Sequence, residues 1–151
     1  MRTFLLAMAF AMAIPAAAHD YRAGSIIVDH PVLRIASPVS KTAAGHMTII
    51  NRGKTADRLL SVTTAGAGRS DLHGTMQVGQ VMQMRPQAQG VPVPAGARVA
   101  FAPGGLHVMF IGLKSSMPEG AMLKARLQFE KAGPIDVMFK TEAAAKGGNH
   151  H

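Results

Sequence analysis

The chain has 151 residues, no cysteine and a formal net charge of +8 with histidine counted as neutral. Without cysteine, the chain can form no disulfide, no thiolate metal site and no blue-copper centre, which needs a cysteine thiolate. The sixteen lysines and arginines are scattered and accompany only one tyrosine, so the basic, aromatic surface of a nucleic-acid-binding protein is missing. A basic chain of this kind favours an acidic protein or an anionic membrane surface as its partner.

Residues 1–18 have the pattern of a cleaved export signal. Arg2 precedes an apolar run, Pro15 breaks it, and the small residues Ala16-Ala17-Ala18 end it. The run is too short to span a bilayer, and no later segment approaches about twenty uninterrupted apolar residues, so we expect no transmembrane segment. Removing these 18 residues from 151 leaves 133, which suits one domain with a single core. We therefore expect a soluble protein exported to the periplasm.

The mature chain reads as strands separated by turns. Short stretches rich in Val, Ile and Phe alternate with Gly, Pro, Asn and Ser. Strands are expected at residues 25–30, 32–36, 46–51, 58–64, 71–76, 80–85, 98–102, 106–111, 121–129 and 135–141. The alternation is clearest in residues 122–129, where Leu123, Ala125, Leu127 and Phe129 share one face. The prediction is a single all-β domain over residues 19–142, a sandwich or small barrel, followed by a mobile tail at 143–151.

Two imidazoles and two thioethers, from His73, Met84, His107 and Met109, form the candidate metal site. Imidazole binds several transition metals, but thioether sulfur is soft and uncharged, so the combination points to copper and especially to Cu(I). His107 and Met109 are two apart on a strand and project from one face. Hairpin pairing is expected to bring His73 and Met84 together. A lone histidine or methionine is usually structural, so these residues suggest copper without establishing it.

Several segments resemble the periplasmic CuA chaperone (PCuAC) family. They are residues 72–73, 81–86, 93–96 and 103–109, flanked by Asp29-His30-Pro31 with Arg34 and by Asp57-Arg58-Leu59. Ten residues separate His73 from Met84, and twenty-two separate Met84 from His107, as the family motif requires to within a residue. Two positions depart from the family: Gly74 stands where many members have methionine, and Val32 where an aromatic residue is common.

This resemblance implies a cupredoxin-like Greek-key β-sandwich or barrel that binds one Cu(I) through His73, Met84, His107 and Met109. It also implies delivery of copper toward the CuA centre of cytochrome c oxidase, with subunit II or another assembly factor as the receiving partner. Such a protein is a carrier and not an enzyme, and we expect a monomer. Because both histidines must be neutral to bind, Cu(I) affinity should fall below about pH 6.5.

Other residues remain open as copper ligands. Met76 and Met82 are read as core residues in preference to a shell around the sulfur ligands. A second, Cu(II) site is conceivable at His19, as a new amino terminus, or at His150 and His151, which equally resemble a purification tag. His30 is read as structural, and His46, outside the motif, is assigned no copper.

Three other functions stay open. The copper site would equally serve copper tolerance or storage. An enzyme reading is a copper oxidase that uses His19 as an amino-terminal histidine brace. A binding-module reading is a basic protein that docks on acidic lipid or protein and carries its methionines incidentally.

Overall fold

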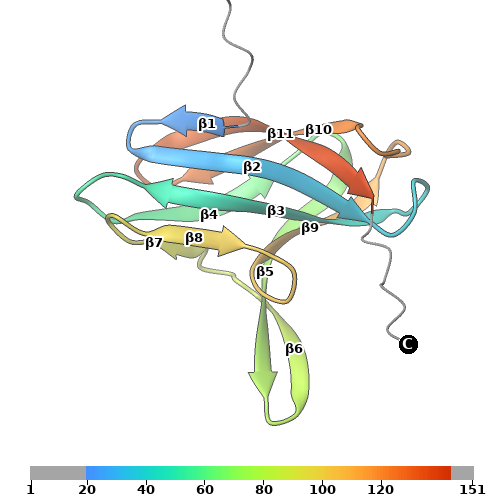
Figure 1. The fold of residues 1–151 in the computed structure, drawn as a ribbon, viewed down its shortest axis with the longest axis horizontal. Coiled ribbons are helices and arrows are strands. Elements are labelled where there is room, and N and C mark those ends of the chain that lie inside the picture. Colours follow the sequence, from blue (N-terminus) through green and yellow to red (C-terminus); the bar gives the residue numbers. More distant parts are fainter. Residues whose placement is uncertain (1–19, 144–151) are drawn as a thin grey trace, which may run out of the picture.

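Strands make up the regular structure of the described chain (Figure 1). The computed structural model describes residues 20–143. Its eleven strands are β1 (Asp20–Ala23), β2 (Ile26–Ile35), β3 (Thr42–Asn51), β4 (Asp57–Thr63), β5 (Ala67–Val78), β6 (Val81–Pro86), β7 (Val91–Val93), β8 (Arg98–Phe101), β9 (His107–Leu113), β10 (Met122–Phe129) and β11 (Gly133–Ala143). Within this range, no helix has the length and apolar character needed to cross a membrane. The all-β prediction is confirmed; the predicted signal at 1–18 lies outside the described residues, as does the predicted tail apart from residue 143.

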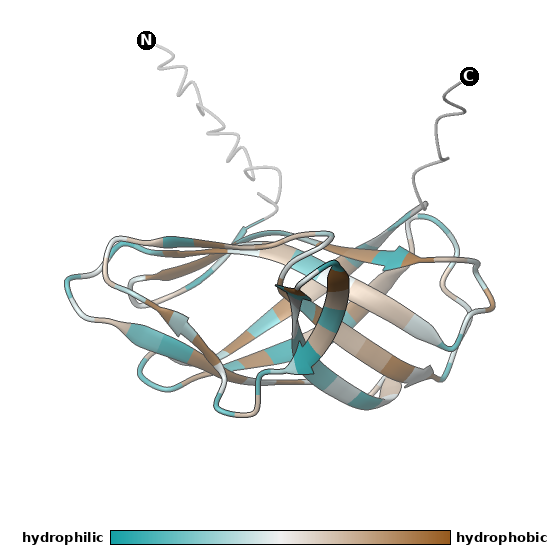
Figure 2. Ribbon diagram, turned by 90° about the horizontal axis from the view of Figure 1, so that it is seen from below, coloured by the Kyte–Doolittle hydropathy of each residue, from teal (hydrophilic) through white to brown (hydrophobic). Residues whose placement is uncertain are grey.

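The strands hydrogen-bond in the order β6-β5-β9-β3-β2-β11-β10-β4-β7, with β1 added to β2 and β8 to β3. The pairing of β11 with β2 is parallel, whereas the other pairings between these strands are antiparallel. Figures 1 and 2 show the strands stacked in two layers. The two layers enclose the apolar core.

Strand β10 shows how the sequence pattern builds this core. Leu123, Ala125, Leu127 and Phe129 are buried, whereas the intervening Lys124 and Arg126 are exposed. Figure 2 shows the same change between apolar and polar residues along several strands. The predicted core face of this strand is therefore confirmed.

Gly45 in β3 lies against two aromatic rings of the core. A Cβ atom placed on it would come within 2.9 Å of the Phe110 ring and 3.0 Å of the Phe139 ring. These two rings pack edge to face, with centroids 5.4 Å apart. Glycine at position 45 thus lets β3 approach the aromatic pair, and this sets the position of the neighbouring His46.

The sequence analysis predicted two strands separated at Pro31, but the structure has one continuous strand, β2, that includes Pro31. The register between β2 and β3 shifts between Asp29 and Val32, and His30 adopts a positive φ of 50°. A bulge at this point accommodates proline, which has no N–H to donate to the ladder. The short strands β1 and β7 were also not expected, and β7 pairs only through Val91–Val93.

Asp57 ties the start of β4 to the turn between β10 and β11. Its carboxylate accepts backbone hydrogen bonds from Arg58 at 2.7 Å and from Lys131 and Ala132 at 2.9 Å each. Burial alone would raise the pKa of Asp57, but these three donors outweigh it and hold the pKa below its usual value. The residue that flanks the family motif in the sequence is therefore a structural anchor.

The hairpin formed by the end of β5 and by β6 projects from the body of the protein (Figure 1). All six residues of β6 are exposed. Val78 and Val81 flank the turn, where Gly79 has a positive φ of 61° that glycine adopts without strain. This arm carries one of the candidate ligands, Met84.

Candidate metal centre

Strand β5 changes its partner at His73. Residues before His73 pair with β9, residues after it pair with β6, and His73 itself is in register with both His107 and Pro86. The site therefore lies where the projecting hairpin joins the body. The register places two candidate ligands of the hairpin and two of β9 at this junction.

His73 and Met84 are in contact. The His73 Nδ1 atom lies 3.2 Å from the Met84 sulfur. Two ligands of one tetrahedral ion, with bonds of about 2.0 Å to nitrogen and 2.3 Å to sulfur as for zinc, would lie about 3.5 Å apart. The hairpin pairing expected from the sequence is confirmed, and the two atoms are near the spacing that a shared metal ion needs.

His107 is buried, with 6% of its surface exposed. Its Nδ1 donates a hydrogen bond of 3.0 Å to the carbonyl oxygen of Gly105, so the neutral ring carries its lone pair on Nε2. This Nε2 is buried and has no hydrogen-bond partner. The ring lies edge-on to His73, with centroids 5.7 Å apart and planes at 89°. A backbone carbonyl thus orients the imidazole as it does in many metal sites.

Met109 follows His107 on the same face of β9. It is partly buried, and its register partners are Asp71 on β5 and Ala44 on β3. Because cross-strand partners project to the same side, the thioether lies beside the ring of His107 and diagonal to His73. The structure therefore brings His73, Met84 and His107 together and places Met109 next to them; their role as copper ligands stays a prediction.

The other candidates are placed differently. Met82 is 57% exposed, so its interpretation as a core residue was wrong. It shares a face of β6 with Met84 and lies two residues nearer the hairpin tip. His30 lies in the β2 bulge, 3.7 Å from Glu142. The side chain of Met76 lies outside the described part of the chain, as do His19, His150 and His151.

One residue at the site was missed by the sequence analysis, namely His46 on β3. It is 8% exposed, and its Nδ1 is buried without a hydrogen-bond partner. Burial, followed by the charges of Arg34 and His107, lowers the pKa of His46. Only the long-range pairing of β3 with β9 brings it here, so no local sequence pattern would have identified it.

A copper site with three or more side-chain ligands in this region would include sulfur. Among residues 20–143, no three His, Asp or Glu side chains converge closely enough to hold a metal ion. A site built from three or more of these side chains is therefore not present in the described chain. The mixed set of imidazole and thioether donors, by contrast, matches the soft preference of Cu(I).

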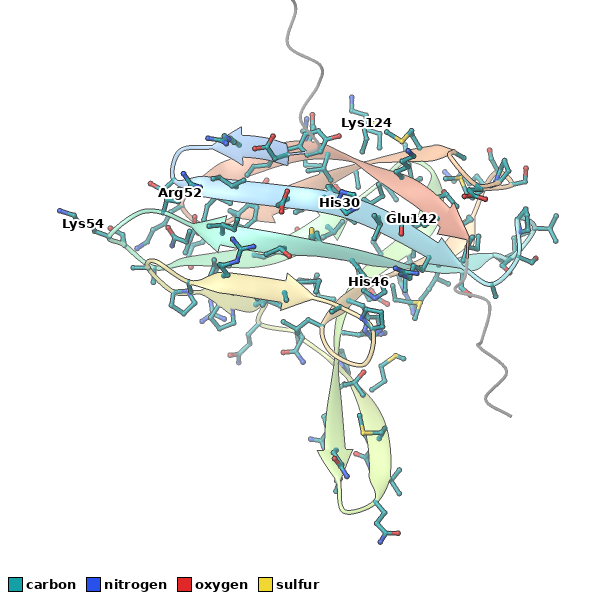
Figure 3. All side chains as sticks on the ribbon, in the orientation of Figure 1. His30, His46, Arg52, Lys54, Lys124 and Glu142 are labelled. Carbon is teal, nitrogen blue, oxygen red and sulfur yellow. The ribbon has the colours of Figure 1, made fainter. Side chains whose placement is uncertain are left out.

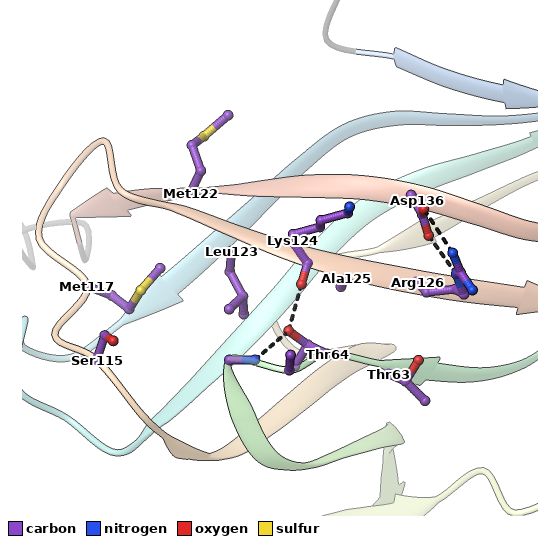
Figure 4. Close-up of a pocket in the computed structure, with 12 residues that line it drawn as sticks. Thr63, Thr64, Ser115, Met117, Met122, Leu123, Lys124, Ala125, Arg126 and Asp136 are labelled. Atoms are coloured by element: carbon purple, nitrogen blue, oxygen red, sulfur yellow. Dashed lines mark hydrogen bonds and ion pairs between the residues drawn. The ribbon is translucent and has the colours of Figure 1, made fainter.

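A separate groove lies elsewhere on the surface. It has a volume of about 660 Å³ and lies between the end of β4 and β10 (Figure 4). Met117, Met122 and Leu123 give it an apolar wall, and the Thr64 hydroxyl donates a hydrogen bond of 2.6 Å to the Lys124 carbonyl oxygen. This groove adjoins the opposite end of the β5–β9 ladder from His73 and presents no cluster of metal ligands.

Comparison with known proteins identifies the family. A family model described as "Putative lipoprotein LpqE-like" matches residues 26–141. A curated relative, "Putative lipoprotein Lxx21020" of Leifsonia xyli subsp. xyli (strain CTCB07), is 29% identical over 112 residues, which cover 70% of this chain and 68% of the relative.

Two solved structures have the same fold. The "Copper-bound PCuAC domain from PmoF2" matches with a TM-score of 0.70 and 28% identity, over 83% of this chain and 99% of that domain. The "Apo PCuAC domain from PmoF1" matches with a TM-score of 0.71 and 29% identity, over 83% of this chain and all of that domain. The predicted cupredoxin-like fold is thereby confirmed. The chain belongs to the LpqE-like family, and its single β-domain is a PCuAC domain.

Proposed function

We propose that this protein is an exported copper carrier that binds one Cu(I) ion through His73, Met84, His107 and Met109. The observation that carries this proposal is the 3.2 Å contact between His73 Nδ1 and the Met84 sulfur. The buried, unpartnered Nε2 of His107 supplies a third donor beside that contact.

The chemistry of the four donors suits a carrier. All four are neutral when they bind, so the loaded site keeps the single positive charge of Cu(I), and no thiol is exposed to an oxidising compartment. Met84 is 54% exposed on the hairpin, whereas His107 is buried in the body. A receiving protein can therefore reach the ion from the Met84 side.

The family and the charge of the chain support a proposed location and destination. The export-signal pattern at residues 1–18 and the lipoprotein descriptions of the family and its relative support a place in the bacterial envelope. The resemblance to CuA chaperones supports delivery toward cytochrome c oxidase subunit II or another assembly factor. The net charge of +8 favours an acidic docking face on that partner. We propose that the protein acts as a monomer and performs no chemistry on the ion.

The test is a competition titration of the protein with Cu(I) against a chelator of known affinity, together with X-ray absorption at the copper edge. We expect one ion per chain, held by two sulfur and two nitrogen ligands. The change Met84→Leu should weaken Cu(I) binding by about tenfold or more, because a soft ligand is lost while side-chain volume is nearly kept.

Met122→Leu is the matched control, because Met122 is 48% exposed and lies on β10, away from the hairpin. It should bind Cu(I) as the unchanged protein does. An absorption spectrum without sulfur ligands, or equal losses in the two variants, would contradict the proposal.

A further inference from the structure

We propose that His46 is a further copper ligand, which together with His107 binds Cu(II) on the outer face of β3 and β9. The inference rests on the proposed copper function and extends it to the oxidised ion. It assigns a role to a residue that lies outside the family motif.

The first observation is a pair of buried ring nitrogens without partners. His46 and His107 are each more than nine-tenths buried, and Nδ1 of His46 and Nε2 of His107 make no hydrogen bond. A buried polar atom left unpaired is destabilising. Two such atoms on neighbouring strands are expected at a site where a bound ligand supplies the missing partner of both.

The strand register places the two rings together. Ala44 pairs with Met109 and Gly45 with Val108, so the next residues along, His46 and His107, come from neighbouring strands at the end of this ladder. Ala44 and His46 alternate with the core residues of β3 and project from its outer face, as Met109 and His107 do on β9. Figure 3 shows His46 near the point where the β5–β6 hairpin leaves the body.

The surroundings of His46 support a ligand more than a hydrogen-bonded structural residue. Its cross-strand partner on β2 is Val32, which offers no side-chain hydrogen bond. Arg34 on β2 is close enough for its charge to act on the ring, but no hydrogen bond joins it to the unpartnered Nδ1 of His46. His107 is the neighbouring imidazole with an equally unsatisfied nitrogen.

The two oxidation states of copper would then use different donors. Cu(II) prefers imidazole nitrogen, whereas thioether sulfur favours Cu(I). His107 lies between His73 on β5 and His46 on β3 and belongs to both sets. The Nε2 atom of His107 would bind Cu(I) together with His73 and the two methionine sulfurs. The same atom would bind Cu(II) together with His46.

The experiment uses the full chain carrying His19→Ala, His150→Ala and His151→Ala, so that no terminal histidine competes for Cu(II). One equivalent of Cu(II) is added, its affinity is measured by chelator competition, and pulsed electron paramagnetic resonance counts the coordinated imidazoles. His46→Phe keeps the ring volume and removes the nitrogens. We expect two imidazoles before the change and one after it, with Cu(II) affinity lower by about tenfold or more.

Cu(I) affinity separates this inference from the proposed function. It should stay within about twofold in His46→Phe, because Cu(I) does not use His46. If Cu(I) binds normally but His46→Phe leaves the Cu(II) affinity and the imidazole count unchanged, the inference is overturned and the proposed function stands. If the background protein binds neither ion, both are overturned.

Two further variants keep the test independent of how well His46→Phe folds. His73→Ala should lose Cu(I) binding yet retain a Cu(II) signal from two imidazoles; a signal from one imidazole would assign the pair to His73 and His107 and overturn the inference. His30→Asn removes an exposed imidazole at a positive φ, which asparagine tolerates, and should change neither affinity.

Discussion

At the scale of single residues, the two proposed sulfur ligands differ in their surroundings. Met84 is exposed on the hairpin, whereas Met109 is partly buried on β9 between two neighbouring strands. Met84 therefore suits exchange with a partner. Met109 lies on a strand that is paired on both sides, so its position is the more constrained of the two.

Replacing Met109 by leucine should separate copper binding from stability. We expect Cu(I) affinity to fall by about tenfold or more, because one soft donor is removed. The free energy of unfolding should change by less than about 1.5 kcal/mol, since leucine nearly conserves the volume. Chelator competition and thermal denaturation measure the two quantities.

Met138→Leu on β11 provides the comparison, because Met138 is also partly buried but pairs with Lys124, far along the sheet from β9. It should leave Cu(I) affinity unchanged. A Met109→Leu protein with the original Cu(I) affinity would remove Met109 from the ligand set.

At the scale of secondary-structure elements, Asp57 makes stability depend on pH. Its pKa is lower in the folded protein than in the unfolded chain, so it stabilises the fold above about pH 4 and loses this contribution as the pH falls through the folded value. Asp57→Asn should lower the free energy of unfolding at pH 7 by about 1–3 kcal/mol, since an amide accepts fewer of the three backbone hydrogen bonds. Chemical denaturation at pH 7 and at pH 3 measures the effect, and the difference between the two proteins should shrink at pH 3.

Asp136→Asn is the control for the loss of a carboxylate. Asp136 forms an exposed ion pair with Arg126, and exposed pairs contribute little to stability. Its unfolding curve at pH 7 should lie close to that of the unchanged protein. If Asp136→Asn lowered the free energy of unfolding as much as Asp57→Asn does, the effect would come from the loss of a negative charge and not from the anchoring of β4.

The β5–β6 hairpin should be the least protected part of the sheet in the absence of copper. All residues of β6 are exposed, and β6 is an edge strand that pairs only with β5. We expect amides of residues 81–86 to exchange with solvent faster than those of residues 107–113, and Cu(I) to slow the former by joining Met84 to β9. Hydrogen exchange followed by mass spectrometry measures both rates.

The β10–β11 ladder should exchange at the same rate with and without Cu(I), because it lies several strands away from the site. Equal protection of β6 in the free and copper-loaded protein would show that Met84 does not join the hairpin to β9 through the ion.

Local sequence patterns predicted most strands and one contact of the site. The alternation in β10 identified its buried face, and the spacing of His73 and Met84 across a Gly79 turn identified the hairpin contact. Pro31 misled the prediction, because a bulge lets one strand run through a residue that lacks an N–H. Short strands such as β7 depend on a partner distant in sequence and carry no pattern of their own.

At the scale of the whole molecule, the fold must be held without disulfides, because no cysteine is present to crosslink it. Phe110, Phe129 and Phe139 are among the largest fully buried side chains. A ligand that binds only the folded state adds to this stability, by about 4 kcal/mol at a free concentration one thousand times its dissociation constant.

Excess Cu(I) should therefore raise the thermal midpoint of the unchanged protein, as measured by calorimetry under reducing conditions. The rise should be absent in His107→Phe, which keeps the ring but removes the buried donor nitrogen. An equal rise in both proteins would mean that copper binds outside the proposed site.

Long-range register explains what the sequence could not reveal. His46 is 27 positions from His73 and 61 from His107, and it reaches the site only because β3 pairs with β9 while β9 pairs with β5. Neither its spacing nor its neighbours in the sequence mark it. The structure singles out His46 through its buried Nδ1 atom, which has no hydrogen-bond partner.

The change of partner along β5 has a mechanical consequence. Strand β5 leaves β9 at His73 and continues with β6 alone. The projecting β5–β6 hairpin is therefore attached to the body next to the proposed ligands. A small tilt of the hairpin about this attachment would move Met84 away from the other proposed ligands. Strand β9 is paired with both β3 and β5, which keeps His107 and Met109 in place. In the proposed mode of binding, an acceptor that contacts the hairpin would detach the ion from Met84 first, and the body of the protein would not need to unfold to release it.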